Sequence, residues 1–174
     1  MKKAYKFFIL GLLTSSMGCV SVQSTIKSDA VPSFQRVLIV TKMRNAPADS
    51  DSYVRQLARL FPAGYETCTL ALTPLSFDSP DDAIRKQAEA CNSEVILTLE
   101  LVQRGYATRY SSSPYQYNAE MRSVTTGQPF WKAVFSTDPR YGSKVPPRSL
   151  VKRLIADHII AGPIPSPNSW QASR

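Results

Sequence analysis

Three short apolar runs alternate with two amphipathic segments between residues 36 and 102, and this order constrains the fold more than any other feature of the chain. The runs are Arg36–Thr41, Thr67–Leu72 and Val95–Val102. Each run has the length and composition typical of a strand buried in a sheet. The segments between them, near 51–61 and 80–90, have the periodicity of helices. This order predicts a βαβαβ unit with parallel pairing and right-handed crossovers.

Both intervening helices have recognisable ends. Ser50 or Asp51 can cap the first helix, which we expect to begin near Asp51 and to stop before residues 62–64, Pro-Ala-Gly. The second helix is expected to be capped by Ser79 and followed by a proline at its first position. The adjacent acids Asp81 and Asp82 meet the positive end of this helix dipole, and neighbouring positions on a helix do not face one another. We therefore expect a capping role for them rather than acid–base catalysis.

The pattern changes to strict alternation after residue 114. Tyrosine and apolar residues alternate with polar ones over 115–124, and a second alternating run covers 130–137. The turn between them has the sequence Thr-Thr-Gly-Gln. This predicts an antiparallel hairpin with one solvated face. A last helix is expected over about 148–160, with His158 on its apolar stripe.

Together these elements predict an α/β fold: a βαβαβ unit, an antiparallel hairpin and a C-terminal helix, with helices packed on a mixed sheet. We expect a single folded domain over residues 34–161. The Pro-rich stretch 162–174 is expected to form an extended or disordered tail. Residues 19–33 are mostly polar and show no periodicity, so we expect a flexible tether there.

The first eighteen residues have the three-part plan of a secretory signal peptide. A basic start, Met-Lys-Lys-Ala-Tyr-Lys, precedes the apolar stretch Phe7–Leu13 and a small-residue exit. The apolar stretch is about half of the roughly 20 residues needed to span a bilayer. We therefore expect residues 1–18 to be removed as a signal peptide.

The signal ends on Gly18 and Cys19, and in this it resembles the signals of bacterial lipoproteins. The resemblance implies cleavage before Cys19 and acylation of that cysteine, which supplies the hydrophobic chains needed for stable anchoring. Val20 follows the cysteine instead of an acidic residue, which in such families implies the outer membrane. The alternative is an ordinary cleaved signal followed by a free or disulfide-bonded Cys19.

The order of elements, the lipoprotein start and the hairpin sequence Thr-Thr-Gly-Gln-Pro-Phe-Trp are similar to small periplasmic lipoproteins of the curli-secretion and penicillin-binding-protein-activator type. The similarity covers about residues 34–160. It implies a mixed sheet that carries helices, with a hairpin after the third strand. It assigns no functional residue.

Residue types that perform catalysis or bind metals are scarce. His158 is the single histidine, and on an apolar helix stripe we expect it to pack or to cap the helix end. One histidine and scattered cysteines do not make a zinc site. The sequence contains no Walker loop, Gly-rich dinucleotide turn or Gly-x-Ser-x-Gly elbow. We therefore expect no enzyme, no cofactor and no metal.

Cys68 and Cys91 remain once Cys19 is acylated. An even pair of cysteines in an oxidising compartment is a candidate disulfide. Cys68 lies near the start of the second strand and Cys91 just before the third, so the bond is plausible where these strand starts share an edge. If the two strands instead flank the first strand on opposite sides, about 10 Å separates them and the bond needs movement. The other interpretation is two small buried apolar side chains.

Charge is unevenly distributed along the chain. The formal charge of +8 falls to +5 when residues 1–18, with three lysines, are removed. Residues 19–100 hold eight basic and ten acidic side chains, whereas residues 101–153 hold nine basic and two acidic ones, interleaved with tyrosines. The residues that we single out as a candidate surface for an anionic partner are Arg104, Arg109, Arg122 and Lys132. The other interpretation is a solvated hairpin face.

These features lead to two hypotheses of function. The first is a lipid-anchored, non-enzymatic envelope accessory that binds a partner protein through the hairpin side or an exposed sheet edge. The second is a module that binds an anionic envelope polymer or lipid head group through the basic, tyrosine-rich segment 101–153. We expect membrane attachment through the lipid and no nucleic acid as a partner, because the protein is exported.

Overall fold

The computed structural model describes residues 20–27, 31–43, 47–74, 77–140 and 142–166. The predicted signal peptide 1–18 and Cys19 lie outside the described residues, as do residues 167–174 of the predicted tail. The elements in chain order are β1 (Val20–Ile26), β2 (Arg36–Lys42), α1 (Pro47–Ala58), β3 (Glu66–Leu72), α2 (Pro80–Ala90), β4 (Val95–Gln103), β5 (Tyr106–Ala107), β6 (Ser112–Ser113), β7 (Tyr115–Ser123), β8 (Pro129–Thr137) and α3 (Pro147–Ala156).

Six of the strands form one mixed sheet, in the order β1-β8-β7-β4-β2-β3. The strands β3, β2 and β4 are parallel, and β7, β8 and β1 are each antiparallel to their neighbours. A separate two-stranded hairpin joins β5 to β6. The predicted α/β fold is therefore confirmed, with the βαβαβ unit, the antiparallel hairpin β7–β8 and the C-terminal helix in their expected order.

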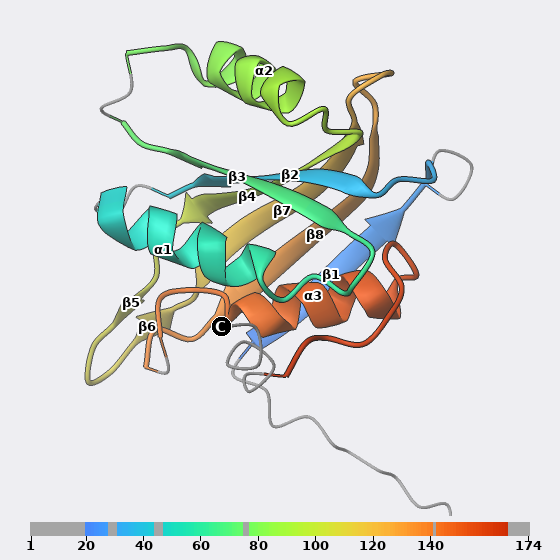
Figure 1. The fold of residues 1–174 in the computed structure, drawn as a ribbon. Coiled ribbons are helices and arrows are strands. Elements are labelled where there is room, and N and C mark those ends of the chain that lie inside the picture. Colours follow the sequence, from blue (N-terminus) through green and yellow to red (C-terminus); the bar gives the residue numbers. More distant parts are fainter. Residues whose placement is uncertain (1–19, 28–30, 44–46, 75–76, 141, 167–174) are drawn as a thin grey trace, which may run out of the picture.

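Helices lie on both faces of the sheet (Figure 1). Helices α1 and α3 cover one face, and the main apolar core between them and the sheet includes Leu97, Tyr117, Trp131, Phe135 and Leu150. Helix α2 lies on the opposite face, which we call the outer face, over a smaller cluster. The alternation predicted for the hairpin explains this arrangement, because every second residue of β7 and β8 enters the main core.

The expected flexible tether over residues 19–33 is wrong for its first half. Residues Val20–Ile26 form β1, which pairs antiparallel with β8 along its whole length. Val20 and Val22 are half-buried against the main core, while Ser21 between them is exposed. This two-residue period gives a polar-looking segment one apolar face, so it completes the sheet instead of staying in solvent.

Helix α3 ends earlier than expected, and His158 is not part of it. The backbone of His158 is left-handed, with φ of 57°. The amide of Ile159 donates to the carbonyl of Leu154, and the amide of His158 donates to that of Ile155. This pair of bonds is the Schellman ending of a helix, in which the residue after the cap turns left-handed. His158 therefore lies exposed beyond the helix and does not line an apolar stripe.

The start of α1 differs from the prediction, and the start of α2 agrees with it. Helix α1 begins at Pro47, four residues before the expected Asp51, because proline suits the first helical turn. The predicted start of α2 is confirmed: the side chain of Ser79 accepts a hydrogen bond from the amide of Asp82, and Pro80 opens the helix.

None of the helices in the described part of the chain is long and apolar enough to span a bilayer.

Candidate functional site

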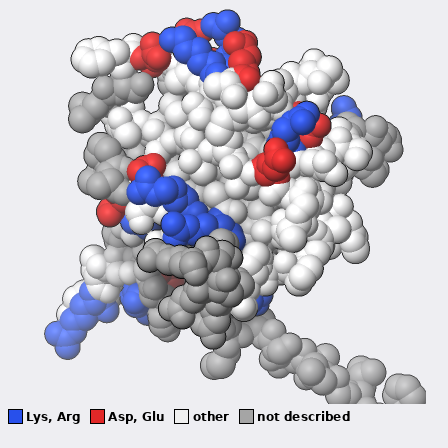
Figure 2. Space-filling model, in the orientation of Figure 1, with Lys and Arg blue, Asp and Glu red and all other residues white. Residues whose placement is uncertain are grey.

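Strand β3 is an edge of the sheet. It pairs in parallel with β2 on one side, and it is the last strand in the order of the sheet, so no described strand of the sheet pairs with its other side. Its residues from Thr67 to Leu72 carry no charge, and most of them are half-buried. Figure 2 shows a broad uncharged surface on this side of the molecule, between the helices α2 and α1 of Figure 1. A stretch of edge strand without charge or proline has main-chain groups that can pair with another strand.

The two faces of β3 rest on different parts of the protein. Cys68 and Leu70 pack with α2 on the outer face, in the cluster that also contains the buried Leu72. Ala71 packs against the main core on the other face. The edge strand is therefore held from both sides, which gives its free edge a fixed direction.

A disulfide joins Cys68 in β3 to Cys91, and their Cα atoms are 6.3 Å apart. Cys91 is the C-cap residue of α2. The side-chain amide of Gln87, one turn earlier, lies 3.2 Å from the sulfur of Cys68 and 3.3 Å from that of Cys91. The bond thus fastens the edge strand to the end of the helix that covers it.

The disulfide forms in a strand order that was expected to prevent it. Strands β3 and β4 do flank β2 on opposite sides, which was expected to prevent the bond. The expectation is wrong because Cys91 does not lie in line with β4. It lies at the end of α2, which packs over β2 and β3 on the outer face, so its sulfur reaches Cys68 across the sheet surface.

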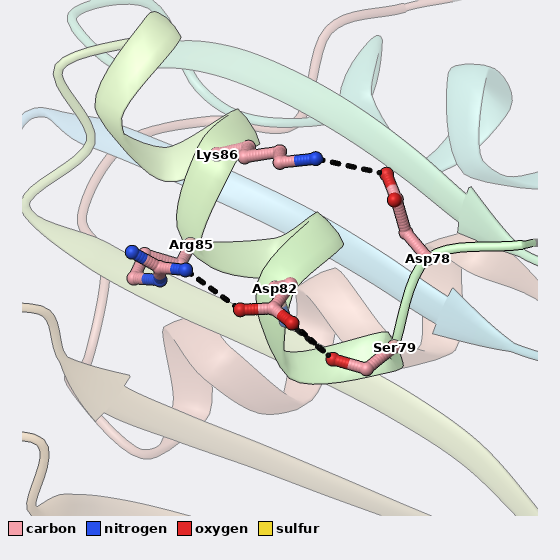
Figure 3. A network of polar contacts seen from close by, with 5 residues as sticks. All are labelled: Asp78, Ser79, Asp82, Arg85 and Lys86. Atoms are coloured by element: carbon pink, nitrogen blue, oxygen red, sulfur yellow. Dashed lines mark hydrogen bonds and ion pairs between the residues drawn. The ribbon is translucent and has the colours of Figure 1, made fainter.

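The start of α2 is stabilised by exposed polar contacts (Figure 3). Asp82 accepts hydrogen bonds from the side chains of Ser79 and Arg85, while Lys86 pairs with Asp78. Hydrogen bonds from Arg85 and Ser79 hold the pKa of the Asp82 carboxyl below its usual value. The contacts of Asp82 are those of a helix cap, as its position at the helix start suggested.

The four basic residues predicted to bind an anionic partner do not form one surface. Arg122 and Lys132 lie on the outer face of β7 and β8, and both pair with the carboxylate of Glu120. Arg109 lies in the turn between β5 and β6, and Arg104 lies just before β5. This hairpin precedes the first residue of β7, whereas Arg122 is near its last, about 23 Å along the strand. The structure therefore separates the candidates into two pairs.

A groove of about 480 Å³ separates α2 from the end of the hairpin β7–β8 on the outer face. Its lining includes the apolar side chains of Ile84, Ile96 and Val124. Arg85 and Arg122 also line it, but each is paired with an acid, Asp82 or Glu120. Lys42, Asp81 and Glu89 also line the groove, and of the four basic candidates from the sequence it contains Arg122.

Sequence reasoning missed a polar cluster that fastens β1 to the rest of the protein. The carboxylate of Asp157, just after α3, accepts hydrogen bonds from Ser24 in β1 at 2.6 Å and from the indole of Trp131 in β8 at 2.7 Å. Arg153 donates to the same carboxylate at 2.9 Å. The side chain of Asp157 is only 8% exposed. Neither Ser24 nor Asp157 belongs to a sequence motif, so no signal pointed to the cluster before the strands were placed.

Replacing Asp157 by asparagine is expected to lower the free energy of unfolding at neutral pH by about 2 kcal/mol, because hydrogen bonds to a charged group are lost. Burial raises the pKa of the Asp157 carboxyl, but the hydrogen bonds from Ser24, Trp131 and Arg153 outweigh burial and leave the pKa below its usual value. A group with a lowered pKa stabilises the fold above its unfolded pKa and loses that effect as pH falls. The difference between the proteins should therefore shrink as pH falls below about 4.

The matched control is Asp138→Asn, since Asp138 forms an exposed pair with Arg140. Surface pairs contribute about 1 kcal/mol or less, so this change should cost less than the change at Asp157. Urea unfolding at neutral and acidic pH measures both effects. Equal losses for the two variants, or a loss at Asp157 that is independent of pH, would contradict the role of the carboxylate.

Two buried tyrosines have structural roles. The phenol of Tyr53 donates to the carbonyl of Val145 at 2.8 Å, and the phenol of Tyr117 donates to that of Ser143. Burial raises the pKa of Tyr53, and burial raises the pKa of Tyr117 to about 12, so both phenols stay protonated at neutral pH. Within the described residues, His, Cys, Asp and Glu side chains form no group of three or more that could hold a metal ion.

Comparisons with known proteins give structural neighbours at low identity. No family model matches the chain, and no curated protein matches it by sequence. A solved structure of the PelC dodecamer from Paraburkholderia phytofirmans is similar at 16% identity and a TM-score of 0.46, covering 79% of this chain and 94% of the other. The lipoprotein GNA1162 from Neisseria meningitidis is similar at 11% identity and a TM-score of 0.39, covering 71% of this chain and 94% of the other.

Proposed function

We propose that this protein is a non-enzymatic accessory of the bacterial cell envelope, anchored to the outer membrane by a lipid on Cys19, and that it binds a partner protein at the free edge of β3. The signal plan of residues 1–18 and the residues Gly18 and Cys19 support the anchor. An anchored domain of this kind faces the periplasm, where a partner in the envelope can reach the sheet edge.

The observation that carries the partner proposal is the edge strand itself. Strand β3 spans seven residues and is uncharged from Thr67 to Leu72. An extended segment that pairs with such an edge gains main-chain hydrogen bonds for affinity and places alternate side chains on the two faces. Next to β3 these faces are made by α2 and by α1, so a segment with apolar side chains on both sides fits best.

An anionic envelope polymer is the competing ligand, and the geometry favours it less. A polymer site needs basic groups that act together, whereas Arg122 and Lys132 share the carboxylate of Glu120. The two ligands respond differently to salt, since polymer binding weakens steeply as ionic strength rises and strand pairing does so far less.

The test places a charge in the middle of the edge. Thr69→Lys in β3 is expected to reduce recovery of the partner at least about tenfold, because a lysine on an edge strand opposes pairing by another strand. Affinity capture of the acylated protein from cross-linked envelopes, at low and high salt, measures the recovery. Thr69 is half-buried, so circular dichroism and urea unfolding verify that the variant is folded.

The matched control is Gln23→Lys, which adds the same charge to the middle of β1, the opposite edge of the sheet. Recovery of the partner should be unchanged in this variant. Loss of the partner from the native protein at high salt would favour an anionic ligand over strand pairing. Undiminished recovery with a folded Thr69→Lys protein would contradict the proposed site.

A further inference from the structure

The sheet begins at Val20, the residue that follows Cys19 in the sequence. Strand β1 begins at Val20, which pairs with Thr137 at the end of β8, and Thr137 in turn pairs with Tyr115 at the start of β7. Neighbouring strands are about 4.8 Å apart, so Val20 and Tyr115 lie within about 10 Å. A lipid on Cys19 would therefore hold this end of the sheet against the membrane surface, because no tether separates the two.

The hairpin β5–β6 lies at the same end of the sheet. Only Pro114 separates β6 from Tyr115, and Figure 1 shows the hairpin and the start of β1 at the lower end of the molecule. The turn of the hairpin β7–β8 lies at the other end. The placement of the hairpin relative to Val20, the residue that follows Cys19, is thus set by the register of three strands.

A close approach fixes the base of this hairpin. A Cβ atom on Gly105 would lie 2.6 Å from the carbonyl oxygen of Ser113 and 2.6 Å from the amide nitrogen of Tyr115. Glycine lets the two chains touch at this point. Inside the turn, Thr108 accepts hydrogen bonds from the amides of Tyr110 and Ser111. The hairpin therefore projects from the sheet in a defined direction.

The exposed side chains of the hairpin combine aromatic rings with positive charge. Tyr106 is 54% and Tyr110 is 90% exposed, and the guanidinium of Arg109 lies 5.9 Å from the ring centroid of Tyr110. Residues 101–119 include two arginines and no acid. Figure 2 shows basic atoms and no acidic ones at this corner. Two acids elsewhere in the fold, Asp49 and Asp138, are paired with Lys144 and Arg140.

We propose that the hairpin β5–β6 is a second membrane contact, in which Tyr106, Tyr110 and Arg109 lie among the head groups of anionic phospholipids beside the lipid anchor. Tyrosine rings favour the depth of the head groups, and arginine pairs with phosphate. The contact rests on the proposed anchor, which brings the hairpin to the surface. With two contacts, the sheet has one fixed orientation relative to the membrane. The free edge of β3 therefore faces one direction, which a single anchor would not ensure.

The test measures how near the hairpin tip comes to lipid. Acylated protein with Tyr110→Trp is reconstituted into vesicles of phosphatidylcholine and brominated phosphatidylglycerol, and quenching of tryptophan fluorescence is recorded. The control is Val124→Trp, since Val124 is exposed and lies just beyond β7, about 30 Å along the strand direction from Tyr115. Both variants keep the native tryptophans, so the difference reports the added residue.

Quenching at position 110 is expected to exceed that at position 124 at least about twofold, because only the hairpin lies at head-group depth. Adding Arg109→Gln should lower quenching at position 110 in these vesicles. Equal quenching at the two positions with the protein bound to vesicles would overturn the hairpin contact while leaving the anchor intact. If the native protein recovered from envelopes carries no acyl chains, the anchor is overturned, and with it the hairpin contact that rests on the anchor.

Discussion

Replacing Cys19 by serine is expected to remove the protein from the membrane fraction almost completely. The acyl chains contribute about 0.8 kcal/mol for each buried methylene group, whereas each basic residue at a membrane surface contributes about 1 kcal/mol. The hairpin contact alone is therefore too weak to hold the protein through a high-salt wash. Fractionation of envelopes, with intact mass measured on the recovered protein, tests this directly.

The intact mass separates the steps of processing. The native protein should lack residues 1–18 and carry the added mass of acyl chains at Cys19, and the serine variant should carry none. A double variant, Cys68→Ser with Cys91→Ser, serves as control, because it removes two other cysteines and should keep both the acyl mass and the membrane partition. Membrane partition of Cys19→Ser equal to that of the native protein would show that the anchor is not a lipid on this residue.

The same double variant is expected to lower the free energy of unfolding by about 3 kcal/mol, the value for a cross-link that closes a loop of some 20 residues. The bond between Cys68 and Cys91 spans a sequence separation of 23 residues and ties β3 to the end of α2. Its loss should loosen the edge strand first, since β3 is paired on one side only. Urea unfolding gives the free energy, and hydrogen exchange at the amides of Thr67–Leu72 gives the local effect.

Cys19→Ser is the reciprocal control, because it should leave this free energy unchanged. Alkylation without reductant should add no label at Cys68 or Cys91 of the protein taken from the envelope. Two labelled thiols there, or a double variant as stable as the native protein, would contradict the disulfide and its role at the edge.

Local sequence signals were sufficient for most of the fold. The three apolar runs became the parallel strands because each is too apolar to be left in solvent, and Ser79 with Pro80 marked the start of α2 by capping chemistry that acts within one turn. The alternation in β7 and β8 identified their buried face for the same reason.

The missed features depend on contacts between distant residues. Strand β1 has only two valines on its inner face, and its stability comes from pairing with β8 and from the bond between Ser24 and Asp157, 133 residues later. The turn at His158 went unrecognised because the usual marker of a left-handed helix end is glycine. Local periodicity contains no information about either contact.

The candidate site was predictable only in part. An exposed sheet edge was foreseen as a class of surface, but which strand forms it depends on the strand order, which places β3 at one end and β1 at the other. The basic residues Arg104, Arg109, Arg122 and Lys132 are close in sequence, yet the length of β7 separates them into two pairs. Spacing along a chain does not reveal distance along a strand until the register is known.

Photo-cross-linking from the edge strand tests the central proposal most directly. A photoreactive residue is placed at position 69 of β3 or at position 23 of β1, and the acylated protein is irradiated in intact cells. The proposal predicts one discrete heavier adduct from position 69 and none from position 23, because the partner pairs with β3. Equal adducts from both positions, or an adduct from position 23 alone, would contradict binding at the β3 edge.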